Sequence, residues 1–151
     1  MGPNKKQNLS SQRINQLQSL LTRINIEKEL LFINQEKESL LLIDEALTHT
    51  SAQSSNNHER LEFLGDAVLR LAASEFIESK FPNMNVGERS ELRAQLVSDR
   101  WLSDVGQSIN IEKVVIIGNK ANSDLSALST IQAEATEALI GAIYECCKNL
   151  N

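Results

Sequence analysis

The 151 residues include few glycines and prolines and many helix formers, which predicts one all-α domain. This length is enough for a hydrophobic core, and no apolar run reaches the ~20 residues that cross a bilayer, so we expect no membrane association. The net charge of −5 does not indicate a nucleic-acid-binding protein, because binding to a phosphate backbone normally uses a basic face.

The ends of the chain suggest a cytoplasmic protein. The polar start, Met1–Lys6, is not followed by the apolar stretch of a signal peptide. Cys146 and Cys147 are adjacent, an arrangement that suits neither a disulfide nor a zinc site. We therefore expect two reduced thiols in the cytoplasm.

Hydrophobic spacing predicts two helices in the first third of the chain. Residues 1–12 are polar, and we expect them to be a disordered tail before a domain of residues 13–151. A first helix is expected from about 14 to 30, since apolar residues recur there at helical spacing. A charged break at 35–39 separates it from a second helix at 40–47.

Four more helices are expected in the rest of the chain. One runs from about 58 to 79 and ends before Pro82, because the residue before a proline avoids helical dihedrals. Others are expected at 88–98, 99–108 and 127–148. Residues 114–118 are rich in β-branched side chains and suggest a short strand.

The stretch from residue 59 to 69 carries three acids on one helical face. Glu59, Glu62 and Asp66 are spaced i, i+3 and i+7. The surrounding residues are apolar, and a helix that is hydrophobic nearly all round is usually buried. Buried carboxylates must be paired, protonated or metal-bound. Arg60 points away from Glu62, so the balancing positive charge has to come from elsewhere.

A second acidic pair, Glu134 and Glu137, lies within the last apolar helix. Both helices carry small residues that would let their backbones approach closely: Gly65, Ala67, Ala138, Gly141 and Ala142. If the helices pack there, four carboxylates converge and repel one another unless cations lie among them. Hard divalent ions such as Mg²⁺ or Mn²⁺ suit an all-oxygen site and can promote phosphodiester hydrolysis.

Three segments resemble ribonuclease III, a metal-dependent endonuclease of double-stranded RNA. Glu59-Arg-Leu-Glu-Phe-Leu-Gly-Asp66-Ala-Val is similar to the family signature, and Ala46-Leu-Thr-His-Thr-Ser51 resembles the segment before it. Glu134-x-x-Glu137-Ala-Leu-Ile-Gly-Ala-Ile-Tyr144 is similar to the second family motif. The resemblance covers about residues 40–147, and it implies a short helix or an extended turn at 114–118 in place of a strand.

The resemblance implies an all-α homodimer that holds a double-stranded RNA between its subunits. It implies Mg²⁺-dependent cleavage, with Mn²⁺ as a possible substitute, to 5′-phosphate and 3′-hydroxyl ends during RNA processing. By position, Glu62, Asp66, Glu134 and Glu137 take the metal-ligand places. Glu59 matches an acid that the family uses near the dimer interface and the RNA, so it is counted with these four as catalytic.

The chain departs from the family pattern at four places. Glu134 stands where Asp is usual, His58 where Asn is usual, and Val86 where many members carry an acid. Residues 118–121 replace the usual Gly-x-Gly-Glu. The seven residues after Tyr144 are too few for the ~65-residue RNA-binding domain that usually follows, so we expect either a catalytic domain alone, as in mini-ribonuclease III, or a truncation of a longer protein.

The acids, the histidines and the basic residues each also have a purely structural interpretation. Either acidic pair alone would suit a solvated helix face, but two pairs within apolar helices favour a metal site. His49 is expected to be a structural hydrogen-bonding residue, and His58 a helix cap or surface residue. Four basic residues are candidates to touch phosphate, although solvated positions are the default for them: Arg89, Arg93, Arg100 and Lys120.

The sequence is also compatible with two other functions. A ribonuclease III-like scaffold could bind RNA without cutting it, as the departures at Glu134, Val86 and 118–121 suggest. A helical Mg²⁺-dependent nucleotide pyrophosphatase also uses paired Glu-x-x-Glu motifs, but those motifs normally lie close together in sequence. Metal-dependent cutting of duplex RNA separates both from the nuclease.

Overall fold

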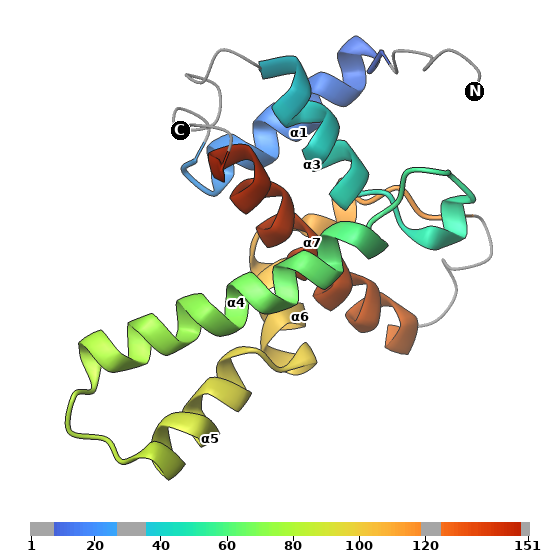
Figure 1. Cartoon of the computed structure of the whole chain (residues 1–151). Coiled ribbons are helices and arrows are strands. Elements are labelled where there is room, and N and C mark those ends of the chain that lie inside the picture. The colour runs from blue at the N-terminus through green and yellow to red at the C-terminus, as the bar shows by residue number, and fades with distance from the viewer. Residues whose placement is uncertain (1–7, 27–35, 119–124, 149–151) are drawn as a thin grey trace.

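The computed structural model describes residues 8–26, 36–118 and 125–148. Within these ranges the chain is mostly helical and contains no strand, which confirms the all-α prediction. None of the described helices is both long and apolar enough to span a membrane. Figure 1 shows a body built around α7, from which α4 and α5 project as a two-helix arm.

The first two helices begin earlier than the sequence indicates. α1 spans Ser11–Arg23, because the side chain of Ser10 accepts a hydrogen bond from the backbone N–H of Arg13 and caps the helix. α3 spans Glu36–Ala46, so the charged break expected at 35–39 is wrong for most of its length. α1 ends at Arg23 and Asn25 has a left-handed backbone (φ 64), so the expected continuation of the first helix through residues 24–26 is wrong. Residues 27–30 and most of the expected tail lie outside the described residues.

The remaining helices agree closely with the predictions. α4 spans Glu59–Lys80, α5 Val86–Leu96, α6 Asp99–Ser108 and α7 Leu125–Lys148. Two 3₁₀ turns, Thr50–Ala52 and Ile111–Lys113, lie in the connections. Residues 114–118 form an extended turn whose only ladder contact is an isolated parallel bridge between Thr48 and Ile116.

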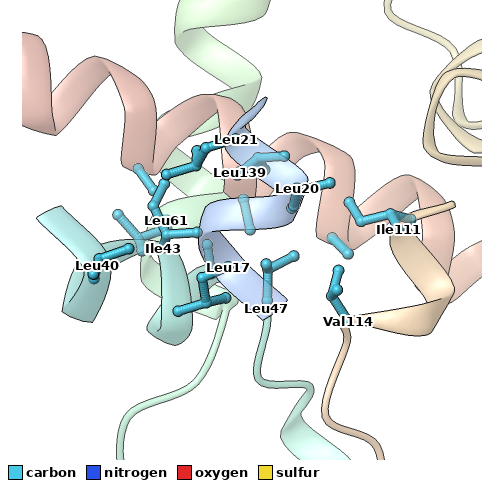
Figure 2. Close-up of a cluster of buried hydrophobic side chains, with 14 of the residues drawn as sticks. Leu17, Leu20, Leu21, Leu40, Ile43, Leu47, Leu61, Ile111, Val114 and Leu139 are labelled. Carbon is cyan, nitrogen blue, oxygen red and sulfur yellow. The ribbon is translucent and has the colours of Figure 1, made fainter. Parts of the chain in front are cut away.

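α7 lies at the centre of the body. Its buried residues pack against α1, α3, the start of α4 and the second 3₁₀ turn (Figure 2). The largest side chains of this core are aliphatic, as the low aromatic content predicts: Leu17, Leu20, Leu21, Ile43, Leu47, Leu61 and Ile111. The core therefore fixes the position of α7 relative to the start of α4.

The backbones of α4 and α7 touch where they cross. A Cβ atom on Gly65 would lie 1.9 Å from the carbonyl oxygen of Glu137, and one on Gly141 would lie 2.1 Å from that of Leu61. Ala138 and Ala142 are fully buried beside this crossing, which confirms the expected close approach. Ala67 is exposed, however, and takes no part in it.

α4 is not buried all round, which corrects the expectation from its composition. Only Leu61, Gly65, Ala73 and Ile77 are buried along it. Large apolar side chains elsewhere on the arm and on α6 are exposed: Phe63 (84%), Leu71 (60%), Phe76 (49%), Val86 (79%) and Trp101 (48%). The acids of α4 therefore lie at the edge of the core and face solvent on one side.

Candidate active site

The crossing of α4 and α7 brings the two acidic motifs together. Glu62 and Asp66 come from α4, and Glu134 and Glu137 from α7, one turn before the glycine contact. All four side chains are half-buried, whereas Glu59 is exposed at the start of α4. The two acidic pairs therefore meet at one surface of the body, but no three of the four carboxylates lie within 4.8 Å of one another.

The charges of these acids act on one another. Burial, and then the negative charges of Asp66 and Glu62, raise the pKa of Glu137 to about 7. Burial also raises the pKa of Glu62, followed by the charges of Glu134 and Glu59. Such shifts mean that protons or cations are favoured within the cluster at neutral pH.

The nearest arginines only partly balance this charge. Arg70 Nε lies 3.0 Å from both carboxylate oxygens of Asp66, one helical turn away. This pair was missed in the sequence, although its i, i+4 spacing is a visible signal. Arg60 instead binds Glu45 and Glu145, which agrees with the prediction that it points away from Glu62.

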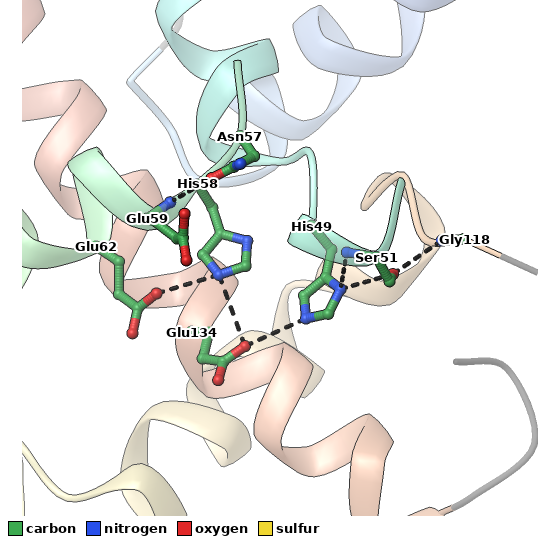
Figure 3. A network of polar contacts seen from close by, with 8 residues as sticks. All are labelled: His49, Ser51, Asn57, His58, Glu59, Glu62, Gly118 and Glu134. Carbon is green, nitrogen blue, oxygen red and sulfur yellow. Dashed lines mark hydrogen bonds and ion pairs between the residues drawn. The ribbon is translucent and has the colours of Figure 1, made fainter. Parts of the chain in front are cut away.

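Two histidines surround the carboxylate of Glu134 (Figure 3). Glu134 Oε2 lies 3.4 Å from Nε2 of His49 and 3.7 Å from Nε2 of His58. His58 Nε2 also lies 3.1 Å from Glu62 Oε2. The two rings are stacked, with centroids 5.0 Å apart. His58 is therefore buried beside two acids, and the expectation of a cap or surface residue is wrong.

Backbone hydrogen bonds hold both histidines in place. The N–H of His49 donates to the carbonyl of Ile116, and the N–H of His58 donates to the carbonyl of Thr48. The side chain of Asn57 accepts from the N–H of Glu59 and so satisfies the start of α4 that His58 leaves uncapped. The imidazole of His58 is thereby free to face Glu62 and Glu134.

Ser51 fixes the orientation of the His49 ring. Its Oγ lies 2.7 Å from His49 Nδ1, and its backbone N–H donates to the same nitrogen at 3.1 Å. The N–H of Gly118 donates to Ser51 Oγ from the neighbouring segment. His49 is thus a hydrogen-bonding residue, as expected, and its Nε2 points at Glu134.

Known proteins are similar to this chain in sequence. Residues 38–146 match the family model described as Ribonuclease-III-like. The chain belongs to the ribonuclease-III-like family. It is 54% identical over 145 residues to Ribonuclease 3 of Prochlorococcus marinus, covering 95% of this chain and 58% of that protein. It is 42% identical over 119 residues to Ribonuclease 3 of Nitratiruptor sp., covering 78% of this chain and 51% of that protein.

Solved structures of the ribonuclease III family share this fold. The nuclease domain of ribonuclease III from Campylobacter jejuni, in a study of flexibility in a region involved in dimer formation, superposes with a TM-score of 0.68. Its sequence is 35% identical, and the match covers 80% of this chain and 85% of that one. The chain spans just over half the length of the curated ribonucleases named above.

One acid near the family's two motifs was missed in the sequence. The charge of Asp99, at the start of α6, contributes to the raised pKa values of both Glu62 and Glu137. Its proximity depends on how α6 packs against α7, and no spacing in the sequence signals that. The cluster therefore draws on a third helix.

The basic residues singled out for RNA contact have different surroundings. Arg89 donates to the carbonyls of Pro82 and Met84, and so holds the turn between α4 and α5. Arg93 donates to Ser74 Oγ, and Arg100 is exposed at the start of α6. Lys120 lies outside the described residues. Arg93 and Arg100 are thus the two whose charge faces solvent.

Proposed function

We propose that this chain is a metal-dependent endoribonuclease that cuts double-stranded RNA, leaving 5′-phosphate and 3′-hydroxyl ends. The observation that carries this proposal is the meeting of the two acidic pairs at the α4–α7 crossing, where burial and the charges of Asp66 and Glu62 raise the pKa of Glu137 to about 7. Membership of the ribonuclease-III-like family supports the same reaction.

The carboxylate cluster fits a hard divalent cation. Its carboxylates repel one another, and among the described residues only Asp66 is paired with an arginine, Arg70, whereas Glu62 and Glu134 have imidazoles nearby. Glu62, Asp66, Glu134 and Glu137 would hold the cation, which we take to be Mg²⁺, with Mn²⁺ able to substitute. When bound, such an ion activates water and stabilises the leaving oxygen of a phosphodiester.

The other residues position these ligands and the RNA. His49 and His58 restrain the carboxylate of Glu134, and Arg70 restrains that of Asp66. Glu59 is exposed at the rim of the site, where it can act near the substrate. Arg93 on α5 and Arg100 on α6 are the proposed phosphate contacts; Arg93 lies against Ser74 of α4, and Arg100 follows Asp99 at the start of α6.

The working form is proposed to be a homodimer. Large apolar side chains are exposed to water on α4 and α6, among them Phe63, Leu71 and Trp101. Exposed apolar groups of this kind often mark a protein–protein interface. The Campylobacter relative has a region involved in dimer formation. A second copy of this chain would cover these side chains and align two acidic sites along one duplex.

A second candidate is an RNA-binding scaffold without cutting activity. Glu134 Oε2 lies near two imidazoles, and Val86 is exposed where many family members carry an acid. Both features would weaken a metal site. The pyrophosphatase alternative, by contrast, gains no support from the family match.

The deciding experiment is cleavage of a long end-labelled RNA duplex with Mg²⁺, with EDTA, and with the Glu137→Ala protein. We expect short fragments with 5′-phosphates in the first lane only. Intact duplex in every lane, from a folded protein at low salt and with Mn²⁺ also tried, would favour the scaffold. Retained RNA binding by gel shift would then identify it.

A further inference from the structure

We propose that His49, His58 and Glu134 form a second cation site, which takes a borderline transition metal such as Zn²⁺ in preference to Mg²⁺. One potential ligand atom from each of these three residues lies within 4.8 Å of the others. Two imidazoles and one carboxylate are a ligand set that zinc uses in proteins, with a fourth position open. Mg²⁺ prefers oxygen ligands and is poorly served by this set.

The distances fit a cation better than direct hydrogen bonds. Glu134 Oε2 lies 3.4 Å from one imidazole Nε2 and 3.7 Å from the other. Hydrogen bonds between nitrogen and oxygen are normally about 2.7–3.2 Å long. Ligands bound at about 2.0–2.1 Å around a tetrahedral zinc ion lie about 3.4 Å apart, which is close to both distances from the imidazoles to Glu134 Oε2.

The surroundings of the two imidazole rings orient them for cation binding. Both are held by backbone hydrogen bonds of their own residues, and the near-parallel stacking directs both Nε2 atoms toward the same oxygen. The side chain of His58 is only 5% exposed, whereas that of Glu134 is 32% exposed. A cation can therefore enter past Glu134, and the fourth position is left for water.

Cation binding requires a change of tautomer at His49. The N–H of Ser51 donates to Nδ1, so in the cation-free state the ring proton lies on Nε2. For Nε2 to bind a cation, it releases that proton and Nδ1 takes one up, with no change in net charge. Nδ1–H then donates to Ser51 Oγ at 2.7 Å, which matches the outer-shell hydrogen bond that metal-bound histidines normally make. In exchange, the N–H of Ser51 loses Nδ1 as its acceptor.

The site shares Glu134 with the carboxylate cluster, so the two sites compete. This consequence rests on the proposed function: zinc would draw Glu134 away from the Mg²⁺ ligands and inhibit cleavage. The binding itself does not depend on that function, because it can be measured without RNA.

The chain offers a direct test, because these are its only two histidines. Every imidazole signal in an NMR spectrum of the untagged protein therefore reports on this site. Cys147 is an exposed thiol that could bind zinc by itself, so the Cys147→Ser protein serves as background. We expect one equivalent of Zn²⁺ to shift the Nε2 resonances of both rings. The same concentration of Mg²⁺ should leave these resonances unchanged.

Calorimetry with Zn²⁺ then compares variants in this background. His58→Asn and His49→Gln keep a polar side chain but remove a ligand, and should raise the dissociation constant at least about 100-fold. Ser51→Ala removes only the outer-shell partner and should raise it about 10-fold. Glu75→Gln changes an exposed acid of α4 elsewhere and should have no effect. Circular dichroism checks that each variant is folded.

The outcomes separate the two proposals. Unmoved imidazole resonances, or equal zinc affinity in wild type and His58→Asn, would overturn the zinc site. In the cleavage assay, each variant is compared with its own rate without zinc. The zinc concentration that halves this rate should be higher in variants with a higher dissociation constant for zinc. If the protein binds zinc through both histidines but never cuts RNA, the zinc site is supported and the proposed nuclease function is contradicted.

Discussion

α4 and α7 have similar apolar composition and similar acidic pairs, yet they differ in how much protein surrounds them. α7 is covered by α3, α4 and α6, and its buried residues extend from Ile131 to Cys146. α4 contacts α7 near its start and α5 near its end, and leaves Phe63 and Leu71 exposed. Composition therefore predicts that a helix needs apolar partners, but not whether its own chain supplies them all.

The largest expected effect lies at the crossing that makes the two helices one site. In Gly65→Ala the new Cβ would lie 1.9 Å from the backbone oxygen of Glu137, which cannot move away without displacing α7. We expect a loss of about 3 kcal/mol or more in the free energy of unfolding, measured with urea. Gly87→Ala is the control: its Cβ would meet only Asn85 Oδ1 at 3.2 Å, and should change stability by less than about 1 kcal/mol. Equal stability of the two variants would contradict the close packing.

The next effect concerns catalysis, which should depend equally on both helices. Glu62→Gln on α4 and Glu137→Gln on α7 each remove a proposed metal ligand. Each should lower the rate of duplex cleavage at least about 100-fold, beyond the usual cost of outer-shell changes. Glu145→Gln, two turns further along α7, breaks only an exposed pair with Arg60 and should leave the rate within a few-fold. A wild-type cleavage rate in either variant would mean that the acid of that helix is not part of the active site.

The exposed face of α4 provides a third test. Phe63→Ser should weaken self-association about 10-fold or more, because burial of a phenylalanine contributes about 1.5–3 kcal/mol. Analytical ultracentrifugation measures the monomer–dimer equilibrium. Asn15→Ala, exposed on α1, is the control. If wild type is monomeric at tens of micromolar, the uncovered face of α4 must have another partner.

The pH dependence of stability should reflect the raised pKa of Glu137. In the metal-free protein the folded state keeps this proton up to about pH 7, whereas the unfolded chain releases it near 4.5. The folded state therefore binds more protons between these values, and stability falls as pH rises through them. We expect a fall of about 1 kcal/mol, since partial exposure of the side chain weakens the effect. Thermal unfolding of Glu137→Gln should show a flatter profile, and an unchanged slope would place the titration on another group.

The smallest effect is expected for the basic residues beside the site. Arg93→Ala and Arg100→Ala should each lower the slope of log affinity for duplex RNA against log salt by roughly 0.9. Arg89→Ala instead removes hydrogen bonds to the α4–α5 turn, and so should lower stability more than it changes the salt dependence. A salt slope that is the same in all three variants would mean that phosphate is bound elsewhere.

Most of the fold could be predicted because periodicity and small residues mark it. The bounds of α6, and those of α4 within a residue, follow from apolar spacing, and Gly65 with Gly141 indicated where two helices meet. The early start of α3 was missed because its first turn is charged, and charge alone does not prevent helix formation. Composition also overstated the burial of α4, because it does not distinguish an apolar face covered within one chain from one left open.

The candidate site was predictable in its acids but not in its other residues. Glu62, Asp66, Glu134 and Glu137 stand at helical spacing within apolar sequence, which is a visible pattern. The contact of His58 with Glu134 joins residues far apart in the sequence, and the influence of Asp99 depends on the packing of α6. Such contacts depend on the three-dimensional crossing of helices and leave no local signal.

The placement of Trp101 determines what optical measurements on this protein can report. It is the only tryptophan, and it lies half-exposed on α6, outside the aliphatic core. Its fluorescence should therefore change little in wavelength when an isolated chain unfolds, because the indole already contacts water. A shift to shorter wavelength with rising protein concentration would instead signal that the indole has become covered. The same fluorophore thus separates association from folding, which circular dichroism follows through the helices.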